Sequence, residues 1–411
     1  MGMRIPSVVA GVESAIRTQG IGVAAEDRPR RLRRPSIGQQ PGFAHSERRL
    51  QRILFEFCGN CNASFGAVVL LEPGKGQLVC WAWRGRSDAC RLCLPKELEL
   101  ARYLVTGVAG FIGRSIAAAL LAQGETVRGI DNFITGNRAN LAGLEAMEFI
   151  EGDLADSASC ARACQGAEIV FHEAALASVP RSVADPVATN VACVDATLNL
   201  LVAARAAGVR RVVYAGSSSA YGDTPTMPKR EDMLPNPISP YAVAKLAAEH
   251  YMRVFARVYG LETVVLRYFN VFGPYQDPTS HYSGVLAIFC RKLLAGEQPT
   301  IYGDGGQSRD FTYIDNVVHA NLLAARAPAD QVSGQMMNAA TGTSMTLNQT
   351  FEILSELTGY QGKPAYAEAR AGDIRDSLAD IGLARELMGY EPKVDFREGL
   401  RRTVDWYRAK L

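Results

Sequence analysis

The stretch Tyr103-Leu-Val-Thr-Gly107-Val-Ala-Gly110-Phe-Ile-Gly113 decides the fold of this 411-residue chain. A short β-rich run, Tyr103–Thr106, leads into three glycines spaced G-x-x-G-x-x-G, and a helical stretch follows to Gln123. Glycines here permit a tight turn and a close approach of backbone to a pyrophosphate, while the helix N-terminus offers N–H donors. A second strand is expected over 126–130, so this segment is predicted to be a dinucleotide-binding βαβ unit.

Strand-like and helix-like segments keep alternating after this unit. Further strands are predicted over Met147–Ile150, Glu168–His172, Arg211–Tyr214 and Thr263–Tyr268. The alternation indicates an α/β fold with a Rossmann-like, doubly wound parallel sheet that has helices on both faces.

An acidic residue ends the second predicted strand. Asp131 follows Gly113 by 18 residues, where the ribose hydroxyls of a dinucleotide are expected. A carboxylate accepts hydrogen bonds from a 2′-hydroxyl and repels a 2′-phosphate, so it favours NAD over NADP. Asp153, after the third strand, is interpreted as lying near the adenine end.

A second set of residues indicates proton-transfer chemistry. Tyr241 and Lys245 are four apart in a predicted helix over 241–259 and so project from one face. A free tyrosine, with a pKa of about 10, is a poor base near neutrality unless positive charge from Lys245 and an oxidised nicotinamide stabilises the phenolate. Ser217 and Ser218, after the strand 211–214, are expected to relay a proton. The alternative is a polar turn and an amphipathic helix that bear these residues by chance.

The composition is that of an ordinary globular protein: 48% hydrophobic, 21% charged, net charge +2. Disorder throughout, collagen-like repeats and coiled coil are excluded. No apolar run is expected to reach the roughly 20 residues of a membrane-spanning helix. Glu13 and Arg17 interrupt the only candidate secretory signal. We therefore expect a cytoplasmic protein with reduced thiols and with neither a nucleic-acid nor a membrane partner.

Residues 1–100 differ from the rest, with 15 basic and 9 acidic residues against 29 and 33 afterwards. They are expected to form an atypical, partly disordered extension, and its basic segment Arg28–Pro35 is interpreted as a solvated tail rather than a nucleic-acid or membrane-surface site. Two C-x-x-C pairs, 28 residues apart, have the spacing of zinc-binding knuckles: Cys58, Cys61, Cys90 and Cys93. A poorly ordered or non-native extension is the competing interpretation.

From about Arg102 to Leu411 the sequence resembles the extended short-chain dehydrogenase/reductases, and within them the UDP-sugar 4-epimerases, most closely the bacterial UDP-N-acetylglucosamine 4-epimerases. The motifs are Thr-Gly-Val-Ala-Gly-Phe-Ile-Gly113, Asp131-Asn-Phe, His172-Glu-Ala-Ala-Leu-Ala-Ser-Val-Pro-Arg181, Ser217-Ser-Ser-Ala-Tyr-Gly-Asp223, Arg267-Tyr-Phe-Asn-Val-Phe-Gly273 and Gly305-Gly-Gln-Ser-Arg-Asp-Phe311.

The resemblance implies roles for individual residues. Tyr241 is the base, Lys245 its electrostatic partner, and Ser217 with Ser218 the hydroxyl relay. The NAD site comprises Tyr241 and Lys245 together with Gly107, Gly110, Phe111, Ile112, Gly113, Asp131, Asn132, Thr135, Gly136, Asp153, Leu154, Asn190 and Tyr268. The UDP-sugar site comprises Ser178, Ser217, Asn270, Gln276, Arg309, Arg370, Asp373 and Ser377.

Two positions narrow the expected reaction. Dehydratases and decarboxylases of this group have an acidic residue beside the active serine or threonine, where this chain has Ser218 and Ser219, so simple epimerisation is favoured. Substrate breadth in the family tracks the position of Ser377, where a bulky tyrosine restricts the cavity to plain hexoses. The small serine predicts UDP-GlcNAc and UDP-GalNAc as substrates.

Three alternatives stay open. A UDP-glucuronate 4-epimerase would need a further cation, for which Arg181 or Arg375 is available, and a UDP-glucose 4-epimerase is the other enzymatic alternative. A nucleotide-sensing protein without catalysis is disfavoured because Ser217, Tyr241 and Lys245 are all present.

The expected organisation is an NAD-binding domain over 101–275, with returning segments near 300–342, and a smaller α/β UDP-sugar-binding domain over 276–411. By family likeness, the apolar helices 190–207 and 241–259 pair across a two-fold axis in a homodimer; ordinary sheet-covering helices are the alternative.

Overall fold

The computed structural model describes residues 102–278, 284–369 and 375–410, and four strands before them. These four form an antiparallel sheet in chain order: β1 (Ile53–Phe55), β2 (Gly66–Leu71), β3 (Leu78–Arg84) and β4 (Asp88–Leu92). Cys58, Cys61 and Cys93 lie outside the described residues, and the side chain of Cys90 in β4 is not described. The zinc site therefore stays a prediction. Within the described part, no three His, Cys, Asp or Glu side chains are arranged to hold a metal ion.

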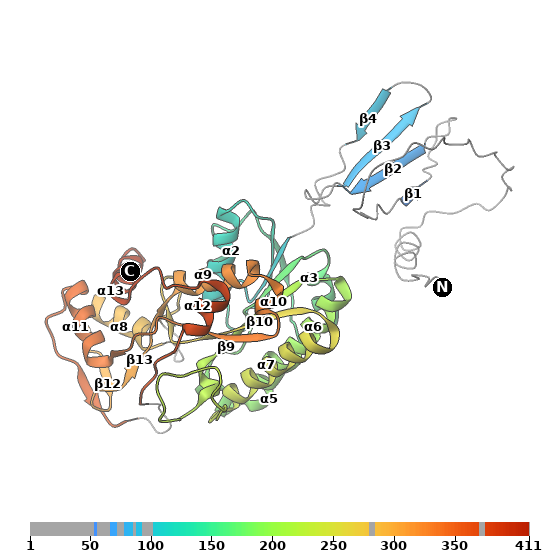
Figure 1. Ribbon diagram of the computed structural model, residues 1–411. Helices are drawn as coiled ribbons and strands as arrows, with labels where there is room; N and C mark the ends of the chain where they lie inside the picture. The colour runs from blue at the N-terminus through green and yellow to red at the C-terminus, as the bar shows by residue number, and fades with distance from the viewer. Residues whose placement is uncertain are drawn as a thin grey trace. The chain divides into compact units, whose positions relative to one another are not determined.

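Seven parallel strands form the central sheet (Figure 1). In spatial order they are β15 (Gln335–Ala339), β10 (Glu262–Tyr268), β9 (Arg211–Ser217), β8 (Ile169–His172), β5 (Tyr103–Thr106), β6 (Val127–Asp131) and β7 (Glu148–Glu151). The order reverses between β5 and β8, which is where open α/β sheets bind ligands, at the carboxyl ends of their strands. The predicted doubly wound fold is confirmed. The sequence patterns identified six of these strands but not β15.

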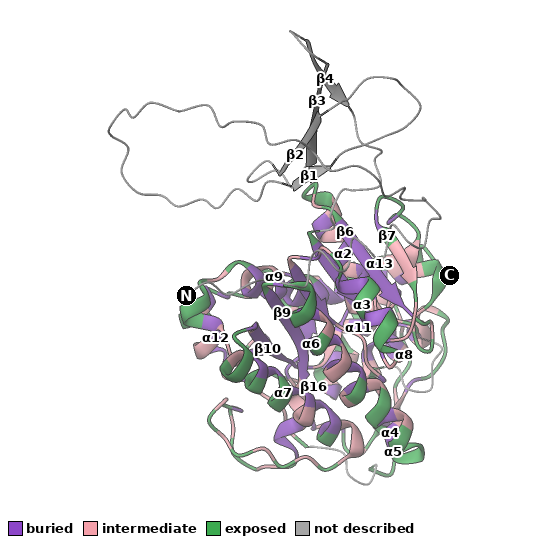
Figure 2. Ribbon diagram, turned by 90° about the vertical axis from the view of Figure 1, so that its right-hand side faces the viewer, coloured by how far each residue is buried: buried purple, intermediate pink, exposed green. Residues whose placement is uncertain are grey.

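Helices cover both faces of the sheet because alternate residues of its strands point in opposite directions. Tyr103 and Val105 of β5 pack with α2 (Phe111–Ala122) and α9 (Ile314–Arg326) in one core cluster. Leu104, between them, packs in a second cluster with α3 (Ser157–Cys164), α6 (Ala196–Ala207) and α7 (Pro240–Tyr259). Figure 2 shows the strands as the buried layer between partly exposed helices.

Short elements follow the sheet's carboxyl edge. They are η2 (Arg138–Leu141), α4 (Val179–Ala184), α5 (Pro186–Asn190), the π-helical turn η3 (Val191–Asp195) and η4 (Ser218–Tyr221). Because α5, η3 and α6 are continuous, Pro186–Ala207 is one helix of 22 residues, and an 18-residue stretch of it has a mean hydropathy of 1.5, long and apolar enough to cross a membrane by length and composition alone. The expectation that no run reaches membrane-spanning length was therefore wrong. Of that 18-residue stretch, 44% is buried within the protein.

The remaining elements follow β10 and pack on the α2 and α9 side. The helices are α8 (Val285–Leu294), α10 (Ala329–Val332), α11 (Leu347–Thr358), α12 (Gly382–Met388) and α13 (Phe396–Arg408). Three strand pairs join them: β11 (Val271–Phe272) with β14 (Thr312–Tyr313), β12 (Thr300–Tyr302) with β17 (Ala365–Ala367), and β13 (Ser308–Arg309) with β16 (Met345–Thr346). One apolar cluster runs from these helices into the sheet. The predicted domain boundaries stay a prediction.

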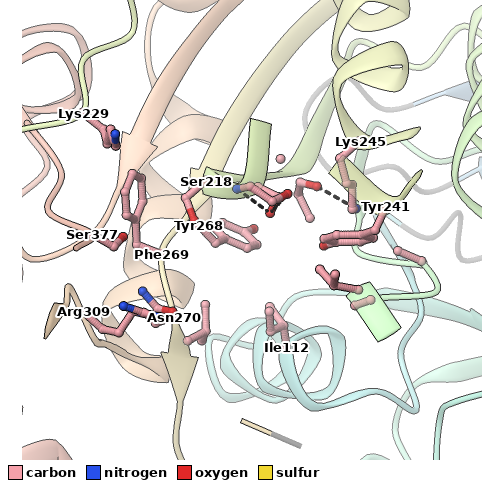
Figure 3. A pocket seen from close by; sticks show the side chains of 18 of the residues that line it. Ile112, Ser218, Lys229, Tyr241, Lys245, Tyr268, Phe269, Asn270, Arg309 and Ser377 are labelled. Carbon is pink, nitrogen blue, oxygen red and sulfur yellow. Dashed lines mark hydrogen bonds between the residues drawn. The ribbon is translucent and has the colours of Figure 1, made fainter. Parts of the chain in front are cut away.

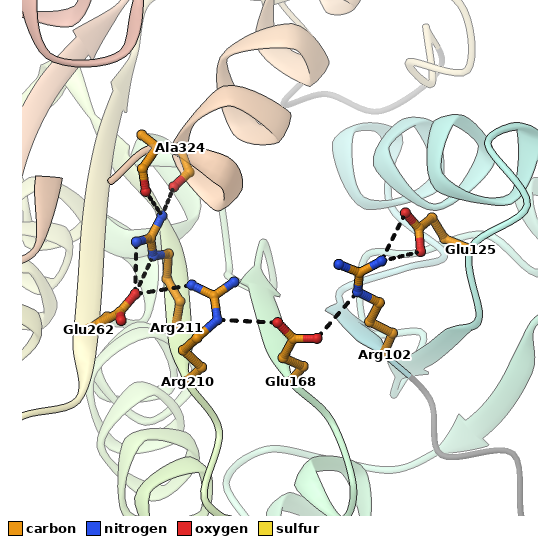
Figure 4. Close-up of polar contacts among 8 residues, drawn as sticks. Arg102, Glu125, Glu168, Arg210, Arg211, Glu262 and Ala324 are labelled. Carbon is orange, nitrogen blue, oxygen red and sulfur yellow. Dashed lines mark hydrogen bonds and ion pairs between the residues drawn. The ribbon is translucent and has the colours of Figure 1, made fainter. Parts of the chain in front are cut away.

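The amino ends of four strands are joined by a chain of ion pairs (Figure 4). Glu168 lies 3.2 Å from Arg102 and 3.2 Å from Arg210. Glu262 pairs with Arg210 and, at 2.7 Å, with Arg211. The buried Arg211 also donates hydrogen bonds to the carbonyl oxygens of Ala324 and Ala327, at 2.7 and 2.8 Å. These contacts tie α9 to the edge of the sheet opposite the ligand-binding edge.

A buried ion pair joins α7 to β10. Arg267 and Glu249 are 1% and 4% exposed and form two hydrogen bonds, of 3.0 and 2.7 Å. The guanidinium also lies 4.4 Å from the centre of the Tyr221 ring, whose hydroxyl donates to Asn338 of β15. Removing one partner of such a pair leaves a buried charge without compensation.

We expect Glu249→Ala to lower the free energy of unfolding by about 3 to 5 kcal/mol, because Arg267 would stay buried with no carboxylate beside it. Urea unfolding monitored by circular dichroism measures this loss. The matched control is Asp232→Ala, which breaks the solvent-exposed pair with Arg230 and should leave the free energy of unfolding almost unchanged. Similar losses in the two variants would contradict the prediction.

Candidate active site

The glycine-rich loop closes tightly over the end of β5. Gly107 has a φ of +64°, and a Cβ there would lie 2.8 Å from the backbone of Ala174. A Cβ on Gly113 would lie 2.3 Å from the Gly107 carbonyl oxygen. Helix α2 then begins after Gly110 with no side-chain cap, so its first N–H groups remain available for an anion.

Asp131 does more than the sequence predicted. Its carboxylate is 8% exposed and accepts hydrogen bonds from the backbone N–H groups of Ala109, at 2.9 Å, and Phe133, at 2.8 Å. It therefore ties the glycine loop to the end of β6. Burial raises the pKa of Asp131, and these backbone N–H donors act in the opposite direction.

A cavity of about 540 Å³ runs along the glycine loop and past Asp131. Ten of the residues predicted for the cofactor line it: Gly107, Gly110, Phe111, Ile112, Gly113, Asp131, Asn132, Thr135, Asp153 and Leu154. A glycine cradle, an uncapped helix N-terminus and a ribose-facing carboxylate in one cavity fit a dinucleotide.

Three predicted residues lie elsewhere. Asn190 is exposed and lines a separate surface cavity beside Pro240, not the cofactor cavity. Gly136 lies behind Asp131, where a Cβ would be 2.8 Å from its Oδ1. Ser178 caps α4 by accepting a hydrogen bond from the Arg181 N–H at 3.2 Å. Its neighbours Ala177 and Val179 line the cavity that contains Tyr241 and Lys245.

A second cavity, of about 360 Å³, contains the predicted catalytic residues (Figure 3). Ser217 ends β9, and its hydroxyl hydrogen-bonds the Ser219 hydroxyl at 2.8 Å. Helix α7 presents Tyr241 and Lys245 one turn apart, and Lys245 Nζ donates to the Ala215 carbonyl oxygen at 2.9 Å. Ser218 also lines this cavity. The structure thus brings the four predicted catalytic residues together.

Burial shifts the pKa values of Tyr241 and Lys245. Burial raises the pKa of Tyr241 above its ordinary value, and the hydrogen bond with Ser217 acts in the opposite direction. Burial also lowers the pKa of Lys245, while the nearby Glu173 raises it. Burial therefore favours the neutral form of Tyr241, and positive charge beside it would favour the phenolate.

The two cavities meet at residues that line both, including Ile112 and Glu173. Glu173 was not predicted as a site residue, although it follows His172 within a motif that the sequence analysis quoted. One carboxyl oxygen of Glu173 lies 3.0 Å from the Tyr268 hydroxyl, which also accepts from Asn321 at 2.7 Å. The other is buried with no hydrogen-bond partner among the described residues. Burial raises the pKa of Glu173 to about 7.

A third cavity, of about 250 Å³, adjoins the catalytic one through Asn270 and Arg309. Gln276 lines its far wall. Arg309 Nη1 donates to the carbonyl oxygens of Ser308 and Arg375, at 2.8 and 2.9 Å. Ser377 lines the catalytic cavity, whereas Arg370 and Asp373 lie outside the described residues.

Comparison with known proteins matches a family model, the NAD dependent epimerase/dehydratase family, to residues 103–340. The chain belongs to this family. A UDP-glucose 4-epimerase from Mycolicibacterium smegmatis is 40% identical over 75% of this chain and 99% of its own length. The solved UDP-N-acetylglucosamine 4-epimerase from Methanobrevibacter ruminantium M1, in complex with UDP-N-acetylmuramic acid, is 41% identical with a TM-score of 0.72, over 76% of this chain and 99% of that one.

A solved UDP-glucuronic acid 4-epimerase variant from Bacillus cereus, in complex with a fluorinated UDP-glucuronic acid and NAD, is 29% identical with a TM-score of 0.70. It aligns with 75% of this chain and 99% of its own. The predicted family and an enzyme of the UDP-sugar 4-epimerase class are therefore confirmed, with NAD as cofactor. The sugars in the names of these relatives differ.

We expect Glu173→Gln to alter how stability depends on pH. The folded protein holds the Glu173 proton more tightly than the unfolded chain, whose carboxyl has a pKa near 4.5. The associated stability is complete below that pH and is lost as pH rises through about 7, by up to about 3 kcal/mol. Urea unfolding of both proteins between pH 4.5 and 8, at equal cofactor content, should show this loss in the wild type only. Parallel pH curves would contradict the assignment.

Proposed function

We propose that the protein interconverts UDP-GlcNAc and UDP-GalNAc by reversible inversion at C4 of the sugar. The observation that supports this most strongly is the group Ser217, Tyr241 and Lys245 in a cavity that opens into the dinucleotide cavity. A binding protein without catalysis would have no need of all three. A cytoplasmic location is part of the proposal, because nucleotide sugars and NAD are available there.

NAD, which the residues lining the dinucleotide cavity would hold, would supply the redox chemistry: an acceptor and then a donor for the C4 hydride, by way of a flat 4-keto sugar. The protein's residues handle the proton. Tyr241 takes the proton of the 4-hydroxyl, and the Ser217 hydroxyl, with Ser218 beside it, holds that hydroxyl and passes the proton on. Lys245, fixed by the Ala215 carbonyl oxygen, stabilises the phenolate by its charge.

Inversion requires that the sugar turn over while the nucleotide remains held. Asn270 and Arg309, between the catalytic cavity and its neighbour, are suited to bind the diphosphate, because a guanidinium binds two oxygens at once. Gln276 would then line the nucleoside end. Binding energy far from C4 thereby positions the reacting carbon.

The choice of an N-acetylhexosamine rests on Ser377, whose small side chain leaves space in the catalytic cavity. UDP-glucuronate is less well supported than UDP-GlcNAc. Arg181 lines the cofactor cavity, and Arg375 is 69% exposed beside Asp304, so neither of these cations faces the sugar. UDP-glucose, which is smaller, fits the same space and is the alternative substrate.

We expect purified protein to convert UDP-GlcNAc to UDP-GalNAc faster than it converts UDP-glucose or UDP-glucuronate to their C4 epimers. Chromatography that separates each substrate from its C4 epimer measures the three rates. A sample without protein is the blank. Tyr241→Phe is the matched control and should lower kcat for UDP-GlcNAc at least a hundredfold, because general-base catalysis typically contributes that much. Turnover of another sugar without UDP-GalNAc would reject the substrate, and a loss below tenfold in Tyr241→Phe would reject the mechanism.

A homodimer is the second part of the proposal. Helix α7 packs beside α5 and α6 and leaves an exposed apolar surface, here called the valine face: Val187, Val191, Val202, Val254 and Val258. Val187 and Val258 are 72% and 66% exposed, and exposed apolar surface of this kind marks interaction sites when it is contiguous. Two such faces, related by a two-fold axis, would bury one another as a four-helix bundle.

We expect the double variant Val187→Asp/Val258→Asp to be monomeric and the wild type to be dimeric. Size-exclusion chromatography with light scattering gives the mass directly. Tyr366→Asp is the control, because it places the same charge on an exposed aromatic residue far along the chain in β17. A wild-type monomer, or a double variant that stays dimeric, would overturn this part of the proposal.

A further inference from the structure

The catalytic cavity contains a buried cation that the mechanism above does not use. Lys229 is only 3% exposed and lines this cavity. In Figure 3 it lies, with Ser377, on the opposite side of the cavity from Tyr241 and Lys245. Lys229 is therefore separate from the proton-transfer group.

The segment that bears Lys229 is fixed against the segment that bears Ser377. The Lys229 N–H donates to the Leu378 carbonyl oxygen at 2.7 Å, and the Asp380 N–H donates to the Lys229 carbonyl oxygen at 2.9 Å. Asn338 also donates to that carbonyl oxygen, at 2.9 Å. Lys229 and Ser377 thus form one wall of the cavity, held in register by backbone hydrogen bonds.

The ammonium retains hydrogen-bonding capacity. It donates to the carbonyl oxygen and to the hydroxyl of Thr224, which uses two of its three N–H groups. Among the described residues, no carboxylate lies within ion-pair distance of Lys229. Burial lowers its pKa, and Asp223 acts in the opposite direction. A buried donor of this kind gains from an acceptor on the ligand.

The same wall also offers acceptors. Asp376 lines the cavity beside Ser377, and its Oδ1 accepts from the Ser308 hydroxyl at 2.6 Å. A donor and acceptors on one wall match an amide, whose carbonyl oxygen and N–H lie side by side. A carboxylate matches less well, because Asp376 and Asp223 would repel it.

We propose that Lys229 is a specificity-determining residue that donates a hydrogen bond to the carbonyl oxygen of the sugar's 2-acetamido group. Asp376 or Ser377 accepts the N–H of the same group. This inference rests on the proposed function, since it identifies how an N-acetylhexosamine is distinguished from a plain hexose. Substrates without the acetamido group make neither contact.

The test compares kcat/KM for UDP-GlcNAc and UDP-glucose in the wild-type holoenzyme and in Lys229→Met. We expect a 10- to 100-fold loss for UDP-GlcNAc, mostly in KM, because a hydrogen bond from a charged donor is worth that much. The change for UDP-glucose should stay within about threefold. Arg375→Met is the matched control, since it removes an exposed neighbouring cation by the same substitution and should leave both values unchanged.

Lys229→Arg is the second variant. It keeps the charge and should restore part of the kcat/KM for UDP-GlcNAc. Thermal unfolding and bound NAD show whether each variant folds. If Lys229→Met does not fold, the ratio of kcat/KM for UDP-GlcNAc to that for UDP-glucose in Lys229→Arg decides the question. Equal losses for both sugars, no loss for either, or a loss confined to UDP-glucose would overturn the role of Lys229 while leaving the proposed function standing. A wild type that does not turn over UDP-GlcNAc would overturn both.

Discussion

The arrangement of the site depends on a close contact between two backbone segments that leaves no room for a side chain. The backbone of Gly107 meets that of Ala174, and a single added carbon would lie 2.8 Å away. This contact joins the loop after β5 to the loop after β8, the neighbouring strands between which the sheet order reverses. The dinucleotide cavity and the catalytic cavity meet beside it and share Ile112 and Glu173. Any larger residue at position 107 would separate the two loops and, with them, the hydride acceptor from the proton acceptor.

The electrostatics of the catalytic cavity disfavour the charged form of the base, Tyr241. Burial raises the pKa of Tyr241 and lowers that of Lys245, so enclosure disfavours both charges. Glu173 partly restores the charge of Lys245. The remaining positive charge that a phenolate needs is that of an oxidised nicotinamide ring. A bound oxidised cofactor would thus favour removal of the sugar's proton and so link the two transfers.

The sequence predicted the sheet well where its strands are continuous apolar runs, as buried parallel strands are. It failed at β15, which begins with Gln335 and contains the buried Asn338; that amide is satisfied by Tyr221, Lys229 and Asp380, contacts that no hydrophobic pattern reveals. The family resemblance implied a place for Asn190 in the cofactor site. The π-helical turn that follows it rotates the preceding helix relative to α6, and Asn190 lies outside the cofactor cavity.

Glu173 and Lys229 show a different limit of sequence reasoning. Each belongs to a segment whose neighbours in space are far away in sequence, Tyr268 for the first and Leu378 for the second. Their importance comes from enclosure, which only the assembled fold defines. The motif residues, in contrast, could be found because short-range geometry fixes them: a glycine turn, a helix N-terminus, or two side chains one turn apart.

Inversion at C4 requires a cavity that holds the nucleotide rigidly at one end and leaves room for the sugar to turn over at the other. Asp310 provides the rigidity: its buried carboxylate accepts hydrogen bonds from Thr341, Gly342 and Ala379, and its carbonyl oxygen accepts one from Asn270. The loops that bear Asn270 and Ser377 are thus fixed to one another. Ser217, at the end of β9, and Tyr241, at the start of α7, present their hydroxyl groups to the same cavity. Specificity can then reside in the fixed wall without hindering the rotation that the reaction needs.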